Sequence, residues 1–359
     1  MFQSRRFNPV LQHSTPSGAD VRRPWSLARA GLISVSLLAL AACGNSGEDP
    51  ALVETEDDTR REVYVTAAFE STNDSSRALA FVPSTMAPSL GMIVSATRDG
   101  GLELFDADGA LRTSHAGAEL TALAAAPGFQ LRGEALPLVF GSAADGSGLL
   151  GYAITPDFEI FDLPLDAIAT ESEIRGVCLF GEGIGYVDLI VLEAGNSALV
   201  ARVQDRGDAQ LSVETVDRFD LPSPARSCTV LNEDIYFAAP ASGIARLSRS
   251  GEVLAERMEL ATGIASDNFN GTPVVLTVNG NDGNVLALDA ETLLPRANFS
   301  FVDGLSTPGI DTASRIALTD QSYGFTAYSD GILAFFDRSD SRIKVVSREA
   351  TVRSFFVSE

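Results

Sequence analysis

Apolar residues between positions 62 and 359 fall in short runs. Examples are Leu102–Phe105, Val187–Leu192, Val274–Val278 and Gly331–Phe336. Gly, Asp, Asn or Pro separates the runs, which recur about every 8–12 residues, a cadence typical of all-β sandwiches, barrels and propellers. Because an amphipathic helical period is almost absent, the pattern predicts an all-β domain.

A longer repeat groups the predicted strands. Six segments share one plan, a small residue followed by an alternating apolar strand and a polar turn; they read GLELFDADG, GLLGYAITPD, ALVARVQDRG, GIARLSRSG, NVLALDAET and GILAFFDRSD. A spacing of about 45–50 residues between such segments is typical of propeller blades, each of which is a small four-stranded sheet. The sequence therefore predicts a six-bladed β-propeller.

The first 42 residues are typical of the signal peptide of a bacterial lipoprotein. Five arginines precede an apolar run, Ala30–Ala42, that ends in Leu-Ala-Ala directly before Cys43. Basic, apolar and then small residues in this order indicate export. The run is shorter than the roughly 20 residues of a membrane-spanning helix, so cleavage before Cys43 is the favoured interpretation. The alternative is a buried hydrophobic helix with an incidental cysteine.

This interpretation divides the chain into three parts. Residues 1–42 form the signal peptide, residues 43–61 a polar, flexible tether, and residues 62–359 the propeller. The similarity to lipoprotein signals implies a lipid on Cys43, and Gly44 after it resembles an outer-membrane address. We expect a protein that its lipid anchors to the membrane of the bacterial cell envelope, facing the periplasm.

Net charge narrows the range of partners. Without the first 42 residues, which hold five Arg and one Asp, 21 basic and 47 acidic side chains remain, a net charge of −26. Such a surface repels nucleic acid and anionic lipid. It either attracts cations or simply keeps the protein soluble. Lys344 is the one lysine, so the binding of an anion would depend on arginine.

Four segments resemble successive landmarks of the β-propeller phytases, in the family's order and rough spacing. They are Thr97–Leu111, Ile174–Phe180, Phe219–Leu247 and Phe301–Thr312, and the resemblance covers most of Val63–Ala334. It implies a six-bladed propeller with a central channel whose mouth holds calcium on Asp and Glu side chains. It also implies phosphomonoester hydrolysis by metal-activated water. Calcium takes six to eight oxygen ligands, so this chemistry depends on convergent carboxylates.

The chain departs from the family pattern where that chemistry would be carried. Neutral or basic residues stand at the family's acidic positions, and an aspartate stands at its lysine position; the residues are Ser75, Ser76, Asp99, Arg226, Ala239, Pro240, Thr262 and Pro308. We expect a catalytically degenerate, phytase-like module without catalytic residues that binds a small molecule or an envelope protein. The alternative is an active calcium-dependent 3-phytase with rearranged ligands.

Several polar residues remain near the expected channel mouth. The candidates for ligand binding are Arg175, Arg226, Glu193, Asn196, Asn279 and Asn281, and those for one calcium ion are Asp282 and Asp311. Alternatively, Asn279–Gly283 forms only a hairpin turn, since Asn-Gly and Asp-Gly are favoured there. The two arginines would either hold an anion bidentately or pair with nearby carboxylates.

Other chemistries are poorly supported. His115 is the one histidine after residue 42, so a Ser-His-Asp hydrolase would depend on it alone and a zinc site would lack ligands. No glycine-rich phosphate loop precedes a helix. Cys178 and Cys228 occupy equivalent parts of neighbouring predicted blades. An oxidising compartment favours a disulfide between them, and two buried free thiols are the alternative.

Overall fold

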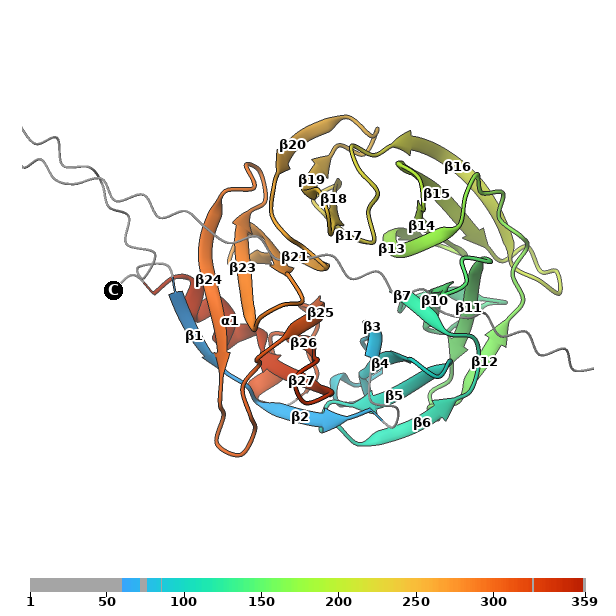
Figure 1. Ribbon diagram of the computed structural model, residues 1–359. Coiled ribbons are helices and arrows are strands. Elements are labelled where there is room, and N and C mark those ends of the chain that lie inside the picture. The colour runs from blue at the N-terminus through green and yellow to red at the C-terminus, as the bar shows by residue number, and fades with distance from the viewer. Residues whose placement is uncertain (1–59, 72–75, 85, 325, 358–359) are drawn as a thin grey trace, which may run out of the picture. The chain divides into compact units, whose positions relative to one another are not determined.

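The computed structural model describes residues 60–71, 76–84, 86–324 and 326–357, which all belong to one compact unit, Glu54–Glu359. Six sheets are arranged radially about a central opening (Figure 1). The predicted six-bladed, all-β propeller is confirmed. The predicted signal peptide, the lipidation site Cys43 and nearly all of the tether lie outside the described residues.

Each blade has four strands, which lie side by side from the centre outward. Blade 1 contains β3 (Ser76–Val82), β4 (Met92–Thr97), β5 (Leu102–Asp106) and β6 (Leu111–His115). Blade 2 contains β7 (Leu120–Ala126), β10 (Leu138–Ala143), β11 (Leu149–Ile154) and β12 (Ile160–Leu163). Blade 3 contains β13 (Ile174–Gly183), β14 (Tyr186–Glu193), β15 (Ser197–Gln204) and β16 (Ser212–Asp220).

Blades 4 to 6 repeat this arrangement. Blade 4 contains β17 (Ser227–Leu231), β18 (Asp234–Ala239), β19 (Gly243–Leu247) and β20 (Val253–Arg257). Blade 5 contains β21 (Gly263–Phe269), β22 (Thr272–Val278), β23 (Asn284–Asp289) and β24 (Pro295–Val302). Blade 6 contains β25 (Ala313–Thr319), β26 (Ile332–Asp337), β27 (Arg342–Ser347) and, as its outer strand, β2 (Ala67–Glu70). Minor elements are β8 (Gln130–Leu131), β9 (Glu134–Ala135), η2 (Pro88–Leu90) and η3 (Thr326–Tyr328).

Strands from the two ends of the described chain close the ring. The early strand β2 pairs antiparallel with the late strand β27, so blade 6 is completed by residues that precede blade 1. The preceding strand β1 (Arg60–Tyr64) adds to blade 5 by pairing parallel with β24, and it begins two residues before the predicted start of the propeller. Figure 1 shows both strands at the outer rim. Ring closure thus depends on backbone hydrogen bonds between distant parts of the sequence.

The hydrophobic core lies between neighbouring blades. Ile190 of β14 and Phe237 of β18 belong to one buried cluster shared by blades 3 and 4, and Phe299 of β24 and Phe335 of β26 belong to another shared by blades 5 and 6. Each large side chain buried in this way contributes about 1.5–3 kcal/mol. Middle strands are buried on both faces, which explains their unbroken apolar runs in the sequence.

The repeated polar turns between the third and fourth strands are closed by side chains. In blade 1, Asp106 Oδ1 accepts hydrogen bonds from the amides of Asp108 and Ala110, at 3.0 and 2.8 Å. In blade 5, Asp289 Oδ1 accepts from the amides of Glu291 and Thr292, at 3.1 and 2.9 Å. In blades 2 and 4, Thr155 and Ser248 accept in the same way from the amides of Glu159 and Glu252. A short polar side chain thus replaces backbone partners in these turns, which explains why the repeat places Asp, Thr or Ser there.

Helix α1 (Arg348–Phe355) follows β27 and fastens blade 6 to blade 5. Ser347 caps it by accepting a hydrogen bond from the amide of Ala350. Arg348 forms a bidentate ion pair with Asp267 of β21 and also donates to the carbonyl oxygen of Asn268, at 2.8 Å. None of the helices among the described residues is long and apolar enough to cross a bilayer.

Candidate functional site

The inner strands of the six blades surround a central channel with a cavity of about 920 Å³. Strands β3, β7, β13, β17, β21 and β25 supply its wall (Figure 1). This volume lies within the range of about 300–1,000 Å³ that is usual for small-molecule sites. The predicted central channel is therefore present, and its cavity is large enough for a small-molecule ligand.

Arginines gather at the end of the channel where the inner strands begin. Arg175 is near the start of strand β13, Arg226 directly precedes β17, and Arg315 lies near the start of β25; all three line the central cavity. A second cavity of about 450 Å³ adjoins this end, because it shares Thr121, Thr262 and Arg315 with the first. Its lining adds Arg98 and Arg338. We call these five residues, Arg98, Arg175, Arg226, Arg315 and Arg338, the arginine mouth.

The guanidinium groups of the arginine mouth differ in their partners. Arg175 pairs with Glu173. Arg315 donates to the carbonyl oxygen of Ser314 at 2.8 Å, and Arg338 to that of Gly280 at 3.4 Å. Arg98 and Arg226 are exposed and have no side-chain hydrogen bond or ion pair within the described part of the chain. Two cations of the mouth are thus available to a ligand.

Carboxylates line the opposite end of the channel. Among the described residues that line the two cavities, the acidic ones are Asp267 and Asp320, at or beyond the ends of β21 and β25. Asp267 is neutralised by its ion pair with Arg348. At the end of the channel that holds the arginine mouth, the lining also includes the neutral hydrogen-bonding side chains of Thr121, Thr262, Asn279 and Asn281. Its chemistry therefore suits an oxyanion, which arginine binds with two parallel hydrogen bonds.

Four of the six predicted ligand-binding residues line these cavities. Arg175 and Arg226 line the central one, and Asn279 and Asn281 line the smaller one. Asn196 is exposed in the turn between β14 and β15 and lines neither. The structure thus places Arg175, Arg226, Asn279 and Asn281 in the lining of two adjoining cavities.

Glu193 has a different position from the one expected. Its carboxylate is completely buried and accepts hydrogen bonds from the amide of Glu171 at 2.6 Å and from Ser197 Oγ at 2.7 Å, and it pairs with Arg218. Burial acts to raise the pKa of Glu193, but these hydrogen bonds and Arg218 outweigh it and lower the pKa. Glu193 therefore fixes the loop before β13 instead of facing the channel.

The segment Asn279–Gly283 is a turn that its own side chains close and whose backbone is also hydrogen-bonded to Ala313 of β25. Asn279 Oδ1 accepts from the amides of Asn281 and Asp282, while Asp282 accepts from Asn279 Nδ2 at 3.1 Å and from the amide of Asn284 at 2.9 Å. Both carboxylate oxygens of Asp282 are thus engaged within the turn. This geometry corresponds to the hairpin alternative.

Neither of the two predicted calcium ligands belongs to a cluster of acidic side chains among the described residues. Asp311 is exposed and lines neither cavity, and within the described ranges no three His, Cys, Asp or Glu side chains converge as a metal-binding group. Since calcium takes six to eight oxygen ligands, a site at Asp282 and Asp311 would need further oxygen donors, and it stays a prediction.

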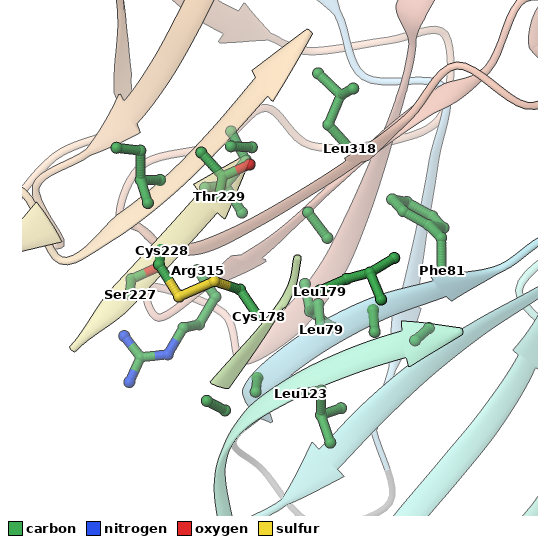
Figure 2. Close-up of a pocket in the computed structure, with 18 of the residues that line it drawn as sticks. Leu79, Phe81, Leu123, Cys178, Leu179, Ser227, Cys228, Thr229, Arg315 and Leu318 are labelled. Atoms are coloured by element: carbon green, nitrogen blue, oxygen red, sulfur yellow. A yellow bond between two sulfur atoms is a disulfide. The ribbon is translucent and has the colours of Figure 1, made fainter. Parts of the chain in front are cut away.

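The two remaining cysteines form a disulfide in the structure. Cys178 of β13 and Cys228 of β17 are bonded across neighbouring inner strands, with their Cα atoms 5.8 Å apart. Both line the central cavity, and Figure 2 shows the bond in the channel wall, with Ser227 next to Cys228. Of the two alternatives for these cysteines, a disulfide or two buried free thiols, this geometry corresponds to the disulfide.

Three members of the arginine mouth were missed by sequence reasoning: Arg98, Arg315 and Arg338. Arg98 and Arg338 each follow the second strand of a blade, since β4 ends at Thr97 and β26 ends at Asp337. The predicted repeat could not show this, because its sixth copy, GILAFFDRSD, is the second strand β26, whereas GLELFDADG is the third strand β5. The register of the sixth copy had to be known before the two turns could be recognised as equivalent.

Comparisons with known proteins support the propeller fold but assign the chain to no family. No family model and no curated protein matches the chain. Among solved structures, a crystal structure of BBS1N in complex with ARL6DN, soaked with mercury, is similar with a TM-score of 0.51 and 10% identity, covering 82% of this chain and 99% of that one. The lead-soaked crystal of the same complex gives a TM-score of 0.44 and 11% identity, covering 71% and 74%. At this identity the likeness shows the propeller fold alone.

Proposed function

We propose that the chain is a non-hydrolytic binding module that takes an oxyanion-bearing ligand at the arginine mouth of its propeller. One observation carries the proposal: five arginines from blades 1, 3, 4 and 6 line two adjoining cavities at one end of the channel. Because the protein carries a net charge of −22, such a local concentration of cations is contrary to its overall composition. A cleft lined by one sign of charge focuses the field and raises the local concentration of oppositely charged ligand.

The phytase resemblance supplies the background of this proposal. We infer that the module keeps the propeller and its channel while the calcium chemistry has been lost. Arg226, Pro240 and Thr262, which replace acids of the family pattern, all line the central cavity and contribute no carboxylate to it. A small molecule suits the concave channel better than an envelope protein, which remains the second candidate partner. The competing activity is calcium-dependent phosphomonoester hydrolysis with relocated ligands.

Neutralising the two arginines without partners tests the proposal. The double substitution Arg98→Gln and Arg226→Gln is expected to weaken the binding of pyrophosphate at least tenfold, because each guanidinium would contribute a charge-assisted hydrogen bond. Isothermal titration calorimetry in buffer stripped of metal by a chelating resin measures this. A resin is needed since soluble chelators are themselves polycarboxylates that would compete for the site.

A matched control separates the site from general electrostatics. Arg206 is an exposed arginine of blade 3 that lines neither cavity and pairs with Glu214. The substitution Arg206→Gln removes one positive charge from the same protein and is expected to leave pyrophosphate affinity within about twofold, since exposed charges are screened by salt. Equal loss in both variants, or no binding by the parent chain, would refute the site.

We further propose that the protein is exported and anchored by a lipid on Cys43, facing the periplasm from the outer membrane. Its disulfide supports export, because such bonds persist in oxidising compartments. The substitution Cys43→Ser is expected to abolish metabolic labelling with palmitate and to move the chain from the membrane fraction to an unprocessed or soluble form. Labelling and fractionation equal to the parent would show that Cys43 is not the anchor.

A further inference from the structure

We propose that the ligand of the arginine mouth is an anionic amphiphile, whose oxyanion head contacts the arginines and whose single aliphatic chain lies in the channel below them. This inference rests on the proposed binding function and narrows the ligand to one chemical class. It is carried by the composition of the channel wall, which changes from cationic at the mouth to aliphatic beyond it.

The wall beyond the mouth includes aliphatic side chains. Inner strands of several blades contribute them to the lining of the central cavity: Leu79, Leu123, Val177, Leu179, Ile264, Ile316 and Leu318. Leu179 and Leu318 are partly exposed, whereas the other five are at most 9% exposed and also pack between the blades. Figure 2 shows Leu79, Leu123, Leu179 and Leu318 around the opening, with Arg315 toward one side of the view. A channel of this kind presents apolar surface to whatever fills it.

The hydroxyl groups of the wall are satisfied by the protein itself. Thr229 Oγ1 and Ser266 Oγ are hydrogen-bonded at 2.8 Å, and Ser266 also contacts the carbonyl oxygen of Val230 at 3.2 Å. Nearer the mouth, Thr121 Oγ1 is bonded to Ser142 Oγ at 2.9 Å. Because these groups already have partners, the middle of the channel does not require a polar ligand.

Shape and charge together select the ligand class. An inorganic oxyanion or a compact polyanion would occupy the mouth and leave the aliphatic wall in contact with water. An aliphatic chain covers that surface, and its transfer out of water is favourable. Inner strands of five to ten residues make the channel on the order of 20 Å long. The Arg348–Asp267 ion pair and Asp320 line its far end, so the apolar stretch is bounded by polar groups on both sides.

Calorimetric titration of the full chain with four probes tests the inference. The probes are dodecyl phosphate, dodecanoate, dodecyltrimethylammonium and inorganic phosphate, each below its micellar concentration. We expect one or both dodecyl anions to bind at least a hundredfold more tightly than inorganic phosphate, and the dodecyl cation to bind at least tenfold more weakly than the tighter anion. The tighter of the two anions indicates whether the natural head group is a phosphate or a carboxylate.

Two variants of the channel wall and one variant of the surface test where the aliphatic chain of the ligand binds. Leu179→Gln and Leu318→Gln are each expected to weaken the binding of the tighter dodecyl anion at least tenfold. The affinity for inorganic phosphate should stay unchanged. Ile184→Gln, at a residue 93% exposed in the turn between β13 and β14, is expected to change neither. An unchanged unfolding midpoint in at least one wall variant shows that the loss is not misfolding.

The outcomes separate this inference from the proposed function. If inorganic phosphate binds and the dodecyl anions bind no more tightly, the amphiphile is excluded and the oxyanion site stands. If neither phosphate nor the dodecyl anions bind, both proposals fail. Equal binding of the dodecyl cation would show a purely apolar channel and overturn the assignment of the head group to the arginine mouth.

Discussion

Replacing Lys344 with methionine is expected to destabilise the propeller by about 3–5 kcal/mol, because it leaves a buried carboxylate without its cation. Lys344 is 1% exposed and Asp337 is completely buried, and Lys344 Nζ donates to Asp337 Oδ2 at 2.8 Å. Lys344 also donates to the carbonyl oxygen of Gly309. The same Asp337 accepts hydrogen bonds from the amides of Asp311 and Thr312, both at 3.0 Å. Urea denaturation followed by circular dichroism measures the loss.

The exposed residue Arg206 provides the control for this substitution. Arg206→Met removes a cation of a half-exposed pair and is expected to cost less than about 1 kcal/mol. If Lys344→Met also lowered the free energy of unfolding by less than about 1 kcal/mol, the structural role of the buried pair would be contradicted. Since Asp337 holds the loop that precedes β25, the pair also fixes one side of the arginine mouth.

Acid titration gives an independent measure of Asp337. Burial acts to raise its pKa, but hydrogen bonds from Lys344 and from the amides of Ser339 and Asp311 outweigh burial and lower the pKa to about 2, from an ordinary 3.8. A carboxylate with a lowered folded pKa stabilises the fold above the unfolded pKa, and this contribution is lost as the pH falls through the folded pKa. The loss therefore spans about pH 4 to pH 2, and Asp337→Asn is expected to remove that part of the acid dependence.

Loss of the disulfide is expected to destabilise the propeller by roughly 4 kcal/mol. Cys178 and Cys228 are 50 positions apart, and the chain-entropy model assigns this value to a loop of that length. The double substitution Cys178→Ala and Cys228→Ala removes the bridge without leaving a free thiol. Its unfolding midpoint in urea should no longer respond to reductant, whereas that of the parent should fall.

Thiol counting checks the same bond directly. Protein purified without reductant from an oxidising compartment should present neither Cys178 nor Cys228 to alkylation after denaturation. It should also run faster in electrophoresis than the reduced form. Two alkylatable thiols, together with a double variant as stable as the parent, would show that the bridge is not formed in the mature protein.

The sequence predicted the blades because their middle strands are buried on both faces. β14, for example, is buried from Val187 to Glu193 and contains the apolar run Leu189–Leu192. The outer strand β16 is mostly exposed and therefore lacked any apolar signature. The closing strand β2 has four residues and a partner at the other end of the propeller, a pairing that no local pattern encodes.

The candidate site was predicted in part for similar reasons. Arg175 and Arg226 were found from the family resemblance, because they lie at the starts of inner strands that line any propeller channel. Arg98 and Arg338 belong to turns of blades 1 and 6, which become neighbours only when the ring closes. Glu193 was misplaced because its burial depends on the loop around Glu171, which folds over it.

Calcium-dependent release of phosphate from phytate by the purified chain tests most directly whether the module binds without hydrolysis. The convergent arginines and the lack of a carboxylate cluster among the described residues predict no release above background, with or without added calcium. Phosphate release that requires calcium, is abolished by its removal and is restored by its return would contradict the proposed function and establish a working calcium-dependent hydrolase.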